Sequence, residues 1–164
     1  MRRTLSILVA VVATFAIAGT AFGANVHLKG RSGPTFVDTG LTLTASGTLT
    51  GLGNGNILVD LTVTGEPTVT CTNPSGSNEP PGQNPAELNL GGQQAIPDGQ
   101  IKNGNVSFSV TTVAPTQPTS AKEAGCPSNQ WTAAITDVEF SGHTAMLTVW
   151  QGGVVVFQQS YLVP

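Results

Sequence analysis

Apolar and polar residues alternate along much of this chain with a period of two. Leu41-Thr-Leu-Thr-Ala45 carries its apolar side chains on one face, and Ile57, Val59, Leu61 and Val63 do the same further along. Such alternation is typical of β-strands with one buried and one solvated face. No stretch of the sequence shows a sustained helical period. The pattern therefore predicts an all-β protein.

Other short alternating or apolar runs predict the remaining strands. These runs are Val26–Leu28, Thr68–Cys71, Leu88–Leu90, Val106–Thr111, Trp131–Phe140, Ala145–Trp150 and Val154–Val163. Glycine-rich stretches at Gly51–Gly55, Ile101–Val106 and Gly152–Gly153 predict β-hairpins, and Gly65-Glu-Pro67 predicts a turn. We expect about eight or nine strands in all.

The spacing of strands and turns predicts an antiparallel β-sandwich with immunoglobulin-like architecture. Each strand offers one uncharged face, which is what two packed sheets require. Cys71 and Cys126 are far enough apart in the sequence to bridge two sheets. Trp131 follows the second cysteine instead of lying between the two. For that reason the term immunoglobulin-like describes the expected architecture and not a family.

Cys71 and Cys126 are the two cysteines of the chain, and we expect them to form one disulfide. A redox pair or a zinc site is the alternative. The sequence has no Cys-x-x-Cys motif, and His27 and His143 are distant from one another. Closing a loop of this length stabilises a fold by roughly 4 kcal/mol in the chain-entropy model. Ser120–Glu123 has capping-box spacing, which predicts a single helical turn before Cys126.

Residues 1–23 have the pattern of a secretory signal peptide. Arg2-Arg3 precedes the apolar run Leu5–Ala18, and small residues leading to Gly23 fit a signal-peptidase site. The run is short for a membrane span, which needs about 20 residues. We therefore expect cleavage after Gly23, release from the membrane, and one extracellular domain over residues 24–164.

The charge of the chain is low and slightly acidic. Six Lys and Arg stand against nine Asp and Glu, for a formal net charge of −3. Two of the basic residues, Arg2 and Arg3, belong to the expected signal peptide. Nucleic acids and anionic membranes need clustered Lys and Arg, so we expect neither as a partner. No cofactor is expected, and the sequence leaves the oligomeric state open.

Candidate catalytic residues are few. Neither His27 nor His143 adjoins a nucleophile motif such as Gly-x-Ser-x-Gly. Asp137 and Glu139 lie two residues apart and would share a strand face, an arrangement that serves acid–base catalysis, calcium binding or a solvated surface. We expect a non-enzymatic protein without a metal, and a glycosidase-like hydrolase that uses Asp137 and Glu139 is the weaker alternative.

Trp150 is the first of two candidate binding features. It is out of phase with Leu147 and Val149, so its ring is expected at the surface beside Gln151. An exposed indole can stack on a sugar ring while its N–H finds a polar partner. This favours a carbohydrate-binding module as an alternative to a structural or interaction module of unknown ligand.

The polar loop after Cys71 is the second binding feature. Its prolines stiffen it, and a stiff loop loses less entropy on binding. A plain surface connection and a protease-inhibitor loop are the other interpretations of this segment. The candidate ligand contacts in the loop are Asn73, Asn78, Gln83 and Asn84.

Several short motifs resemble those of a group of small secreted bacterial proteins of uncharacterised activity. The motifs are His27-Leu-Lys-Gly, Gly40-Leu-Thr-Leu-Thr-Ala-Ser-Gly, Gly51-Leu-Gly-Asn, Cys71-Thr-Asn-Pro, Pro81-Gly-Gln-Asn-Pro85, Ile101-Lys-Asn-Gly-Asn-Val-Ser-Phe and Gly125-Cys-Pro. The resemblance covers nearly all of residues 24–164 and implies a bacterial exported β protein. It brings no activity, cofactor or catalytic residue.

Overall fold

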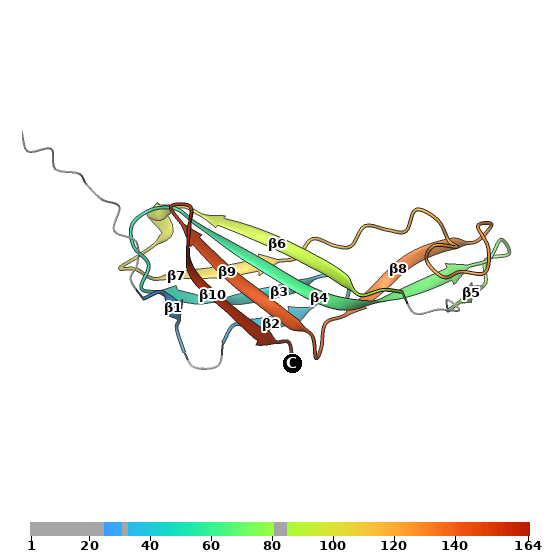
Figure 1. The fold of residues 1–164 in the computed structure, drawn as a ribbon, viewed down its shortest axis with the longest axis horizontal. Helices are drawn as coiled ribbons and strands as arrows, with labels where there is room; N and C mark the ends of the chain where they lie inside the picture. The colour runs from blue at the N-terminus through green and yellow to red at the C-terminus, as the bar shows by residue number, and fades with distance from the viewer. Residues whose placement is uncertain (1–24, 31–32, 81–84) are drawn as a thin grey trace, which may run out of the picture.

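The computed structural model describes residues 25–30, 33–80 and 85–164, so the expected signal peptide lies outside the described residues. The described chain forms antiparallel β-strands and one short 3-10 helix (Figure 1). The elements are β1 (His27–Leu28), β2 (Thr35–Asp38), β3 (Leu43–Thr50), β4 (Ile57–Thr72), β5 (Asn78–Glu79), β6 (Leu88–Ile96), η1 (Asp98–Gln100), β7 (Val106–Thr111), β8 (Thr132–Glu139), β9 (Thr144–Gln151) and β10 (Val154–Leu162).

The all-β class and the antiparallel pairing are confirmed. The strands differ from the expected set of about eight or nine in two ways. β2 and β5 were not expected, and the two runs expected at Ile57–Val63 and Thr68–Cys71 belong to one strand, β4. β5 is a pairing of only 2 residues, which is too short to show alternation in the sequence.

β4 is the central strand and runs unbroken through 16 residues. Along one edge it pairs first with β9 and then with β8, and along the other edge with β6 and finally with β5. β10 pairs with the far side of β9. The other strands form a second sheet, in which β3 pairs with β1 and β2 on one edge and with β7 on the other.

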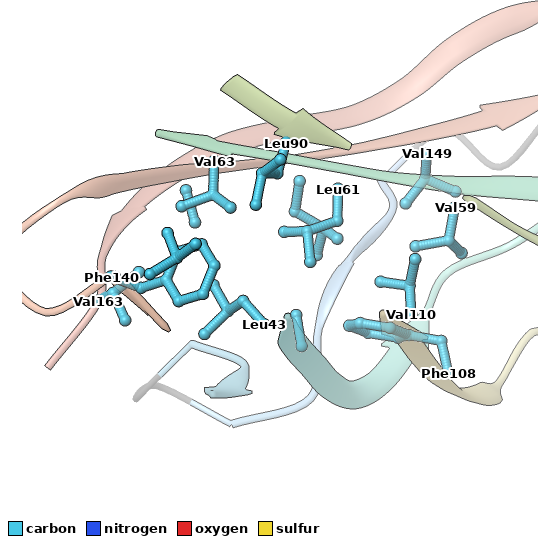
Figure 2. Packing of buried hydrophobic residues seen from close by; sticks show 14 of the residues in the cluster. Leu43, Val59, Leu61, Val63, Leu90, Phe108, Val110, Phe140, Val149 and Val163 are labelled. Carbon is cyan, nitrogen blue, oxygen red and sulfur yellow. The ribbon is translucent and has the colours of Figure 1, made fainter. Parts of the chain in front are cut away.

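One hydrophobic cluster draws side chains from both sheets (Figure 2). Leu43 and Val110 of the second sheet lie in it together with Leu61, Val149 and Phe140 from the β4 side, and none of these five is more than 1% exposed. Burying one large apolar side chain contributes about 1.5–3 kcal/mol. The shared cluster therefore ties the two sheets to one another.

The turn expected at Gly65-Glu-Pro67 is wrong, because β4 continues through it. Buried residues keep the same phase from Ile57 to Cys71. Gly65 serves packing: a Cβ at this position would lie 2.5 Å from Val138 Cγ1 and 3.0 Å from the ring of Phe140. Pro67 falls beyond the last pairing with β6, and a strand tolerates proline where one edge is unpaired.

The hairpin expected around Gly51–Gly55 is also wrong, because β3 and β4 belong to different sheets. Gln151 anchors this crossover and is only 1% exposed. Its Nε2 donates to the carbonyls of Gly53 and Gly55 at 2.9 and 3.1 Å, and its Oε1 accepts from the Gly53 N–H at 3.1 Å. The hairpin between β9 and β10 is confirmed, and Lys102 pairs with Asn105 across a tight turn.

The distal half of β4 projects beyond the second sheet as a narrow arm (Figure 1). We define the arm as residues 66–79, which include the end of β4 and β5, together with β8 and the connecting segment 112–131. The other described residues form the body. The connecting segment leaves the body at Thr112, whose backbone N–H donates to the Leu43 carbonyl at 3.0 Å and whose Oγ1 accepts from the Leu43 N–H at 3.0 Å. The arm and the body thus share one continuous strand.

Gly92 marks a close approach of β6 to the end of β7, and it gives the first prediction. A Cβ at this position would lie 1.9 Å from the Thr111 carbonyl oxygen. We expect Gly92→Ala to lower the free energy of unfolding by at least about 2 kcal/mol, since backbone must move to accept the methyl group. Urea denaturation at equilibrium measures this change.

Gly91→Ala is the matched control, because a Cβ on Gly91 would meet its nearest atoms at 3.7 and 3.9 Å. We expect its unfolding free energy to stay within about 1 kcal/mol of the wild-type value. Similar losses in the two variants would contradict the close approach at Gly92.

Candidate functional site

The sheet formed by β6, β4, β9 and β10 has one face that points away from the hydrophobic cluster, and we call it the outer face. The register between neighbouring strands places side chains of the outer face opposite one another, so that they form rows across the sheet. The rows are Ala95–Leu58–Trp150–Val155, Gln93–Asp60–Thr148–Gln158 and Gly91–Thr62–Met146–Ser160. The first row is apolar and the second is polar.

Trp150 is the largest side chain of the outer face. It lies on β9 and is 38% exposed, which confirms its expected place at the surface. Its cross-strand neighbours are Leu58 on β4 and Val155 on β10. Directly opposite side chains on neighbouring strands are close enough to pack together. The indole is therefore flanked by aliphatic groups on both sides while part of its surface meets solvent.

The polar row beside Trp150 is internally hydrogen-bonded. Gln158 Nε2 donates to Thr148 Oγ1 at 3.3 Å and to Met146 Sδ at 3.5 Å. Thr148 is only 4% exposed, whereas the amides of Gln93 and Gln158 are open to solvent. Asp60 is the one carboxylate of the three rows, and none of their residues is Lys or Arg. The face thus sets an indole beside amides, hydroxyls and a single negative charge.

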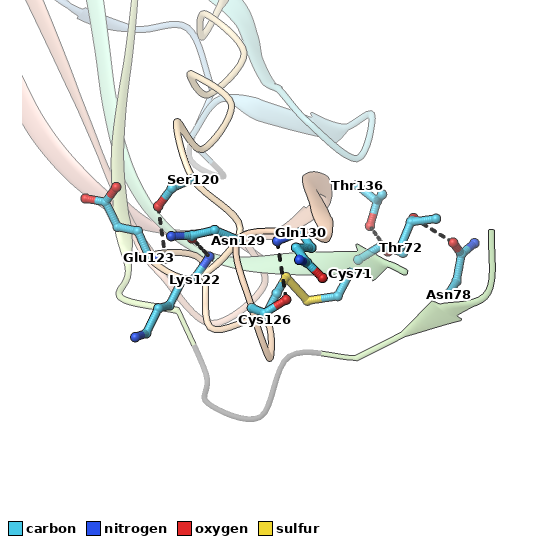
Figure 3. Close-up of a disulfide and its surroundings, with 12 residues drawn as sticks. Cys71, Thr72, Asn78, Ser120, Lys122, Glu123, Cys126, Asn129, Gln130 and Thr136 are labelled. Carbon is cyan, nitrogen blue, oxygen red and sulfur yellow. Dashed lines mark hydrogen bonds between the residues drawn. A yellow bond between two sulfur atoms is a disulfide. The ribbon is translucent and has the colours of Figure 1, made fainter. Parts of the chain in front are cut away.

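The disulfide between Cys71 and Cys126 is present and lies in the arm (Figure 3). Both residues are buried, and their Cα atoms are 5.7 Å apart. A hydrogen-bonded turn precedes Cys126 in place of the expected helical turn: the Glu123 N–H donates to Ser120 Oγ at 3.2 Å, and the Cys126 N–H to the Ala121 carbonyl at 2.9 Å. The bridge secures the connecting segment to the distal end of β4.

Gln117 gives the connecting segment a second attachment to the arm. Its Oε1 accepts from the Ile135 N–H at 2.7 Å, and its Nε2 donates to the Ile135 carbonyl at 3.3 Å. One amide side chain thereby satisfies both backbone groups of an edge residue of β8, much as a neighbouring strand would. Sequence reasoning missed this residue, because a polar glutamine in a proline-rich loop gives no sign of its partner.

The loop after Cys71 uses its candidate ligand contacts for its own structure. Asn73 Oδ1 accepts from the backbone N–H groups of Ser75 and Ser77, each at 2.9 Å. Asn78 Oδ1 accepts from Thr72 Oγ1 at 2.7 Å. These two asparagines therefore hold a turn closed. Gln83 and Asn84 lie outside the described residues.

Trp150 and this loop do not share a site. Trp150 pairs with Leu58 near the start of β4, and the loop leaves the other end of the strand after Thr72. A strand of 16 residues spans roughly 50 Å at about 3.3 Å per residue. The sequence candidates thus separate into an outer-face group in the body and a loop group at the tip of the arm.

Asp137 and Glu139 are both exposed on β8, but only Glu139 lines the cavity beside them. Glu139 lies opposite Glu66 on the neighbouring strand, and both line a shallow cavity of about 380 Å³ at the base of the arm. Asp137 is paired with Thr68 and is not among the residues lining that cavity. The Glu139 carboxylate also accepts from the Ser141 N–H at 3.0 Å.

The two histidines lie apart. His27 Nδ1 is 2.9 Å from the Asn25 carbonyl, and His143 Nδ1 is 3.4 Å from Thr64 Oγ1. Within residues 25–30, 33–80 and 85–164, no three His, Cys, Asp or Glu side chains gather as metal ligands. In the same ranges no helix is long and apolar enough to cross a membrane.

Tyr161 is the described group whose titration is clearly displaced. Desolvation on the inner side of β10 raises the pKa of its hydroxyl above the ordinary value of 10.0. Its ring centroid lies 6.4 Å from that of Phe36. The hydroxyl is therefore neutral at physiological pH, and the residue links β10 to β2 by packing.

No protein-family model, curated protein or solved structure matches this chain.

The arm supplies the second prediction. Reducing the disulfide removes a cross-link between residues 55 positions apart in the sequence, and such a link contributes about 4 kcal/mol in the chain-entropy model. Because Cys126 secures the connecting segment, amide hydrogen exchange should rise first at Ile135 and its neighbours in the arm. Leu61 and Leu147 in the body should keep their protection. Exchange measured by mass spectrometry before and after reduction tests this.

The Cys71→Ser, Cys126→Ser double variant serves as the control for reductant effects and should show the same pattern. An equal rise in exchange throughout body and arm would contradict the division of the molecule into these two parts.

Proposed function

We propose that this protein is an exported, non-enzymatic β-sandwich protein that works by binding an extracellular ligand. Three observations support the proposal: the signal-like pattern of residues 1–23, a disulfide suited to an oxidising compartment, and two antiparallel sheets with one shared hydrophobic cluster. Immunoglobulin-like describes the proposed architecture only. The resemblance to small secreted bacterial proteins fits the same setting.

A carbohydrate-binding module is the specific form of this proposal that the outer face supports. The observation that carries it is Trp150, which is partly exposed on an open sheet face beside amide and hydroxyl groups. The flat apolar face of an indole packs against the C–H groups of a sugar ring. Gln93 offers both donors and an acceptor, whereas Gln158 offers its Oε1 because its Nε2 donates to Thr148 and Met146. Sugar hydroxyls need partners of both kinds.

The charge of the outer face favours a neutral glycan. Asp60 is the only charged residue in its three rows. A carboxylate accepts hydrogen bonds from sugar hydroxyls but repels uronate or sulfate groups. Anionic polysaccharides and nucleic acids would need Lys or Arg on the binding surface. The ligand class we propose is therefore a neutral polysaccharide.

Two alternatives have less support. A glycosidase-like hydrolase needs Asp137 and Glu139 in one cavity, whereas the carboxylates that share a cavity are Glu66 and Glu139. A protease inhibitor that presents the loop after Cys71 needs free contact groups there. Asn73 and Asn78 already direct their side-chain oxygens to partners within the arm.

The third prediction tests the glycan proposal. Affinity electrophoresis in gels that contain neutral polysaccharides, such as xylan, mixed-linkage β-glucan or hydroxyethyl cellulose, should retard the wild-type protein. Trp150→Ala should weaken that retardation by about tenfold or more, because it removes the central stacking group. Trp150→Phe should keep part of the affinity, because a smaller ring still stacks.

Trp131→Phe, in the arm, is the matched control for the loss of a tryptophan and should bind like the wild type. Gels that contain carboxymethyl cellulose test the charge argument and should retard the protein less than hydroxyethyl cellulose. If the Trp150→Ala variant is retarded as strongly as the wild type, the outer face is not the binding site.

A further inference from the structure

β10 is the open edge of the larger sheet. It pairs with β9 from Val154 to Leu162, and among the described residues no other strand pairs with it. The opposite edge, β6, is covered. There the Val113 N–H donates to the Gly91 carbonyl at 2.8 Å, and Gln94 Oε1 reaches across to accept from the Ser109 N–H of β7 at 2.8 Å. In the body, the sheet therefore has one covered edge, β6, and one open edge, β10.

β10 lacks most of the features that protect an open edge. Natural edge strands are kept from pairing by charged residues, by proline or by short length. β10 is 9 residues long and contains neither a charged residue nor a proline. It has one protective feature, a bulge between Val155 and Phe157, and the register from Phe157 to Leu162 is regular.

The exposed side chains of β10 are uncharged as well. Val154 and Val155 are 46% and 45% exposed, and Leu162 is 69% exposed. Gln158 and Gln159 between them are also exposed. An extended, uncharged edge with exposed aliphatic groups is a template for another strand.

We propose that β10 pairs antiparallel with β10 of a second copy of this chain about a two-fold axis, which forms a dimer with one continuous sheet. Two-fold pairing sets this edge against itself, so the edge must be self-complementary. Amide and hydroxyl side chains meet that condition because each both donates and accepts. Gln158, Gln159 and Ser160 form such a run, with no charge to repel its own copy.

The dimer would extend the outer face. A two-fold axis perpendicular to the sheet keeps both outer faces on the same side, and Val155 of β10 adjoins Trp150. Two Trp150 rows would then lie on one surface and could engage one polysaccharide chain, which raises its apparent affinity. This consequence rests on the proposed glycan function, whereas the strand pairing does not depend on it.

Sedimentation velocity of the secreted protein over a range of concentrations tests the pairing. We expect the weight-average mass of the wild type to rise toward that of a dimer. The double variant Gln159→Lys, Ser160→Lys places like charges on facing edges and should weaken dimerisation by at least about tenfold. The double variant Asn89→Lys, Gln93→Lys adds the same charge to exposed positions of β6 and should dimerise like the wild type.

Mixing the lysine variant with a variant of opposite charge distinguishes loss of strand pairing from loss of folding. Gln159→Glu, Ser160→Glu should be monomeric alone and should form a heterodimer with the lysine variant. A wild type that stays monomeric at every concentration, or a lysine variant that dimerises unchanged, would overturn the proposal. Trp150→Ala should still dimerise, so failure of glycan binding and failure of edge pairing give different results.

Discussion

The continuity of β4 is the constraint on which the rest of this structure depends. Its 16 residues alternate between buried and exposed positions from end to end, and partners cover most of both its edges. In the body it supplies one side of the hydrophobic cluster, and in the arm it carries Cys71. Gly65 makes this continuity possible, because Val138 and Phe140 occupy the space where its side chain would stand.

The same strand separates the attachments of the arm from the face proposed to bind a ligand. The disulfide and Gln117 fasten the connecting segment at one end of β4, whereas Trp150 pairs near the other end. Neither attachment touches the rows of the outer face. Changes confined to the arm therefore alter local opening of the arm without moving the side chains proposed to meet a ligand. Conversely, truncating an exposed indole on the outer face removes contact area for a ligand and little of the core.

Local alternation was enough to predict the strand class and the exposed place of Trp150. The disulfide was predicted from a different signal, two cysteines in a chain with a signal-like N-terminus. The errors arose where local signals competed. Gly65 and Pro67 indicate a turn, although Val63, Val69 and Cys71 keep one phase across them, and the phase of the buried residues is the better guide. The neighbours of Trp150 could not be predicted from the sequence, for a different reason. Leu58 and Val155 become its neighbours through register between strands, which no single segment encodes.

Low charge links the two surfaces for which we propose functions. A chain with nine acidic and six basic residues has few charges to distribute. Asp60 is the only charged residue in the three rows of the outer face, which suits a neutral ligand, and β10 contains no charged residue. In most sheets a lysine would protect such an edge from pairing. Here the opposite edge is covered by protein contacts, while β10 is left with amides, a hydroxyl and aliphatic groups that match their own copy. The composition that disfavours nucleic acid as a partner is thus the composition that leaves this edge open to a second chain.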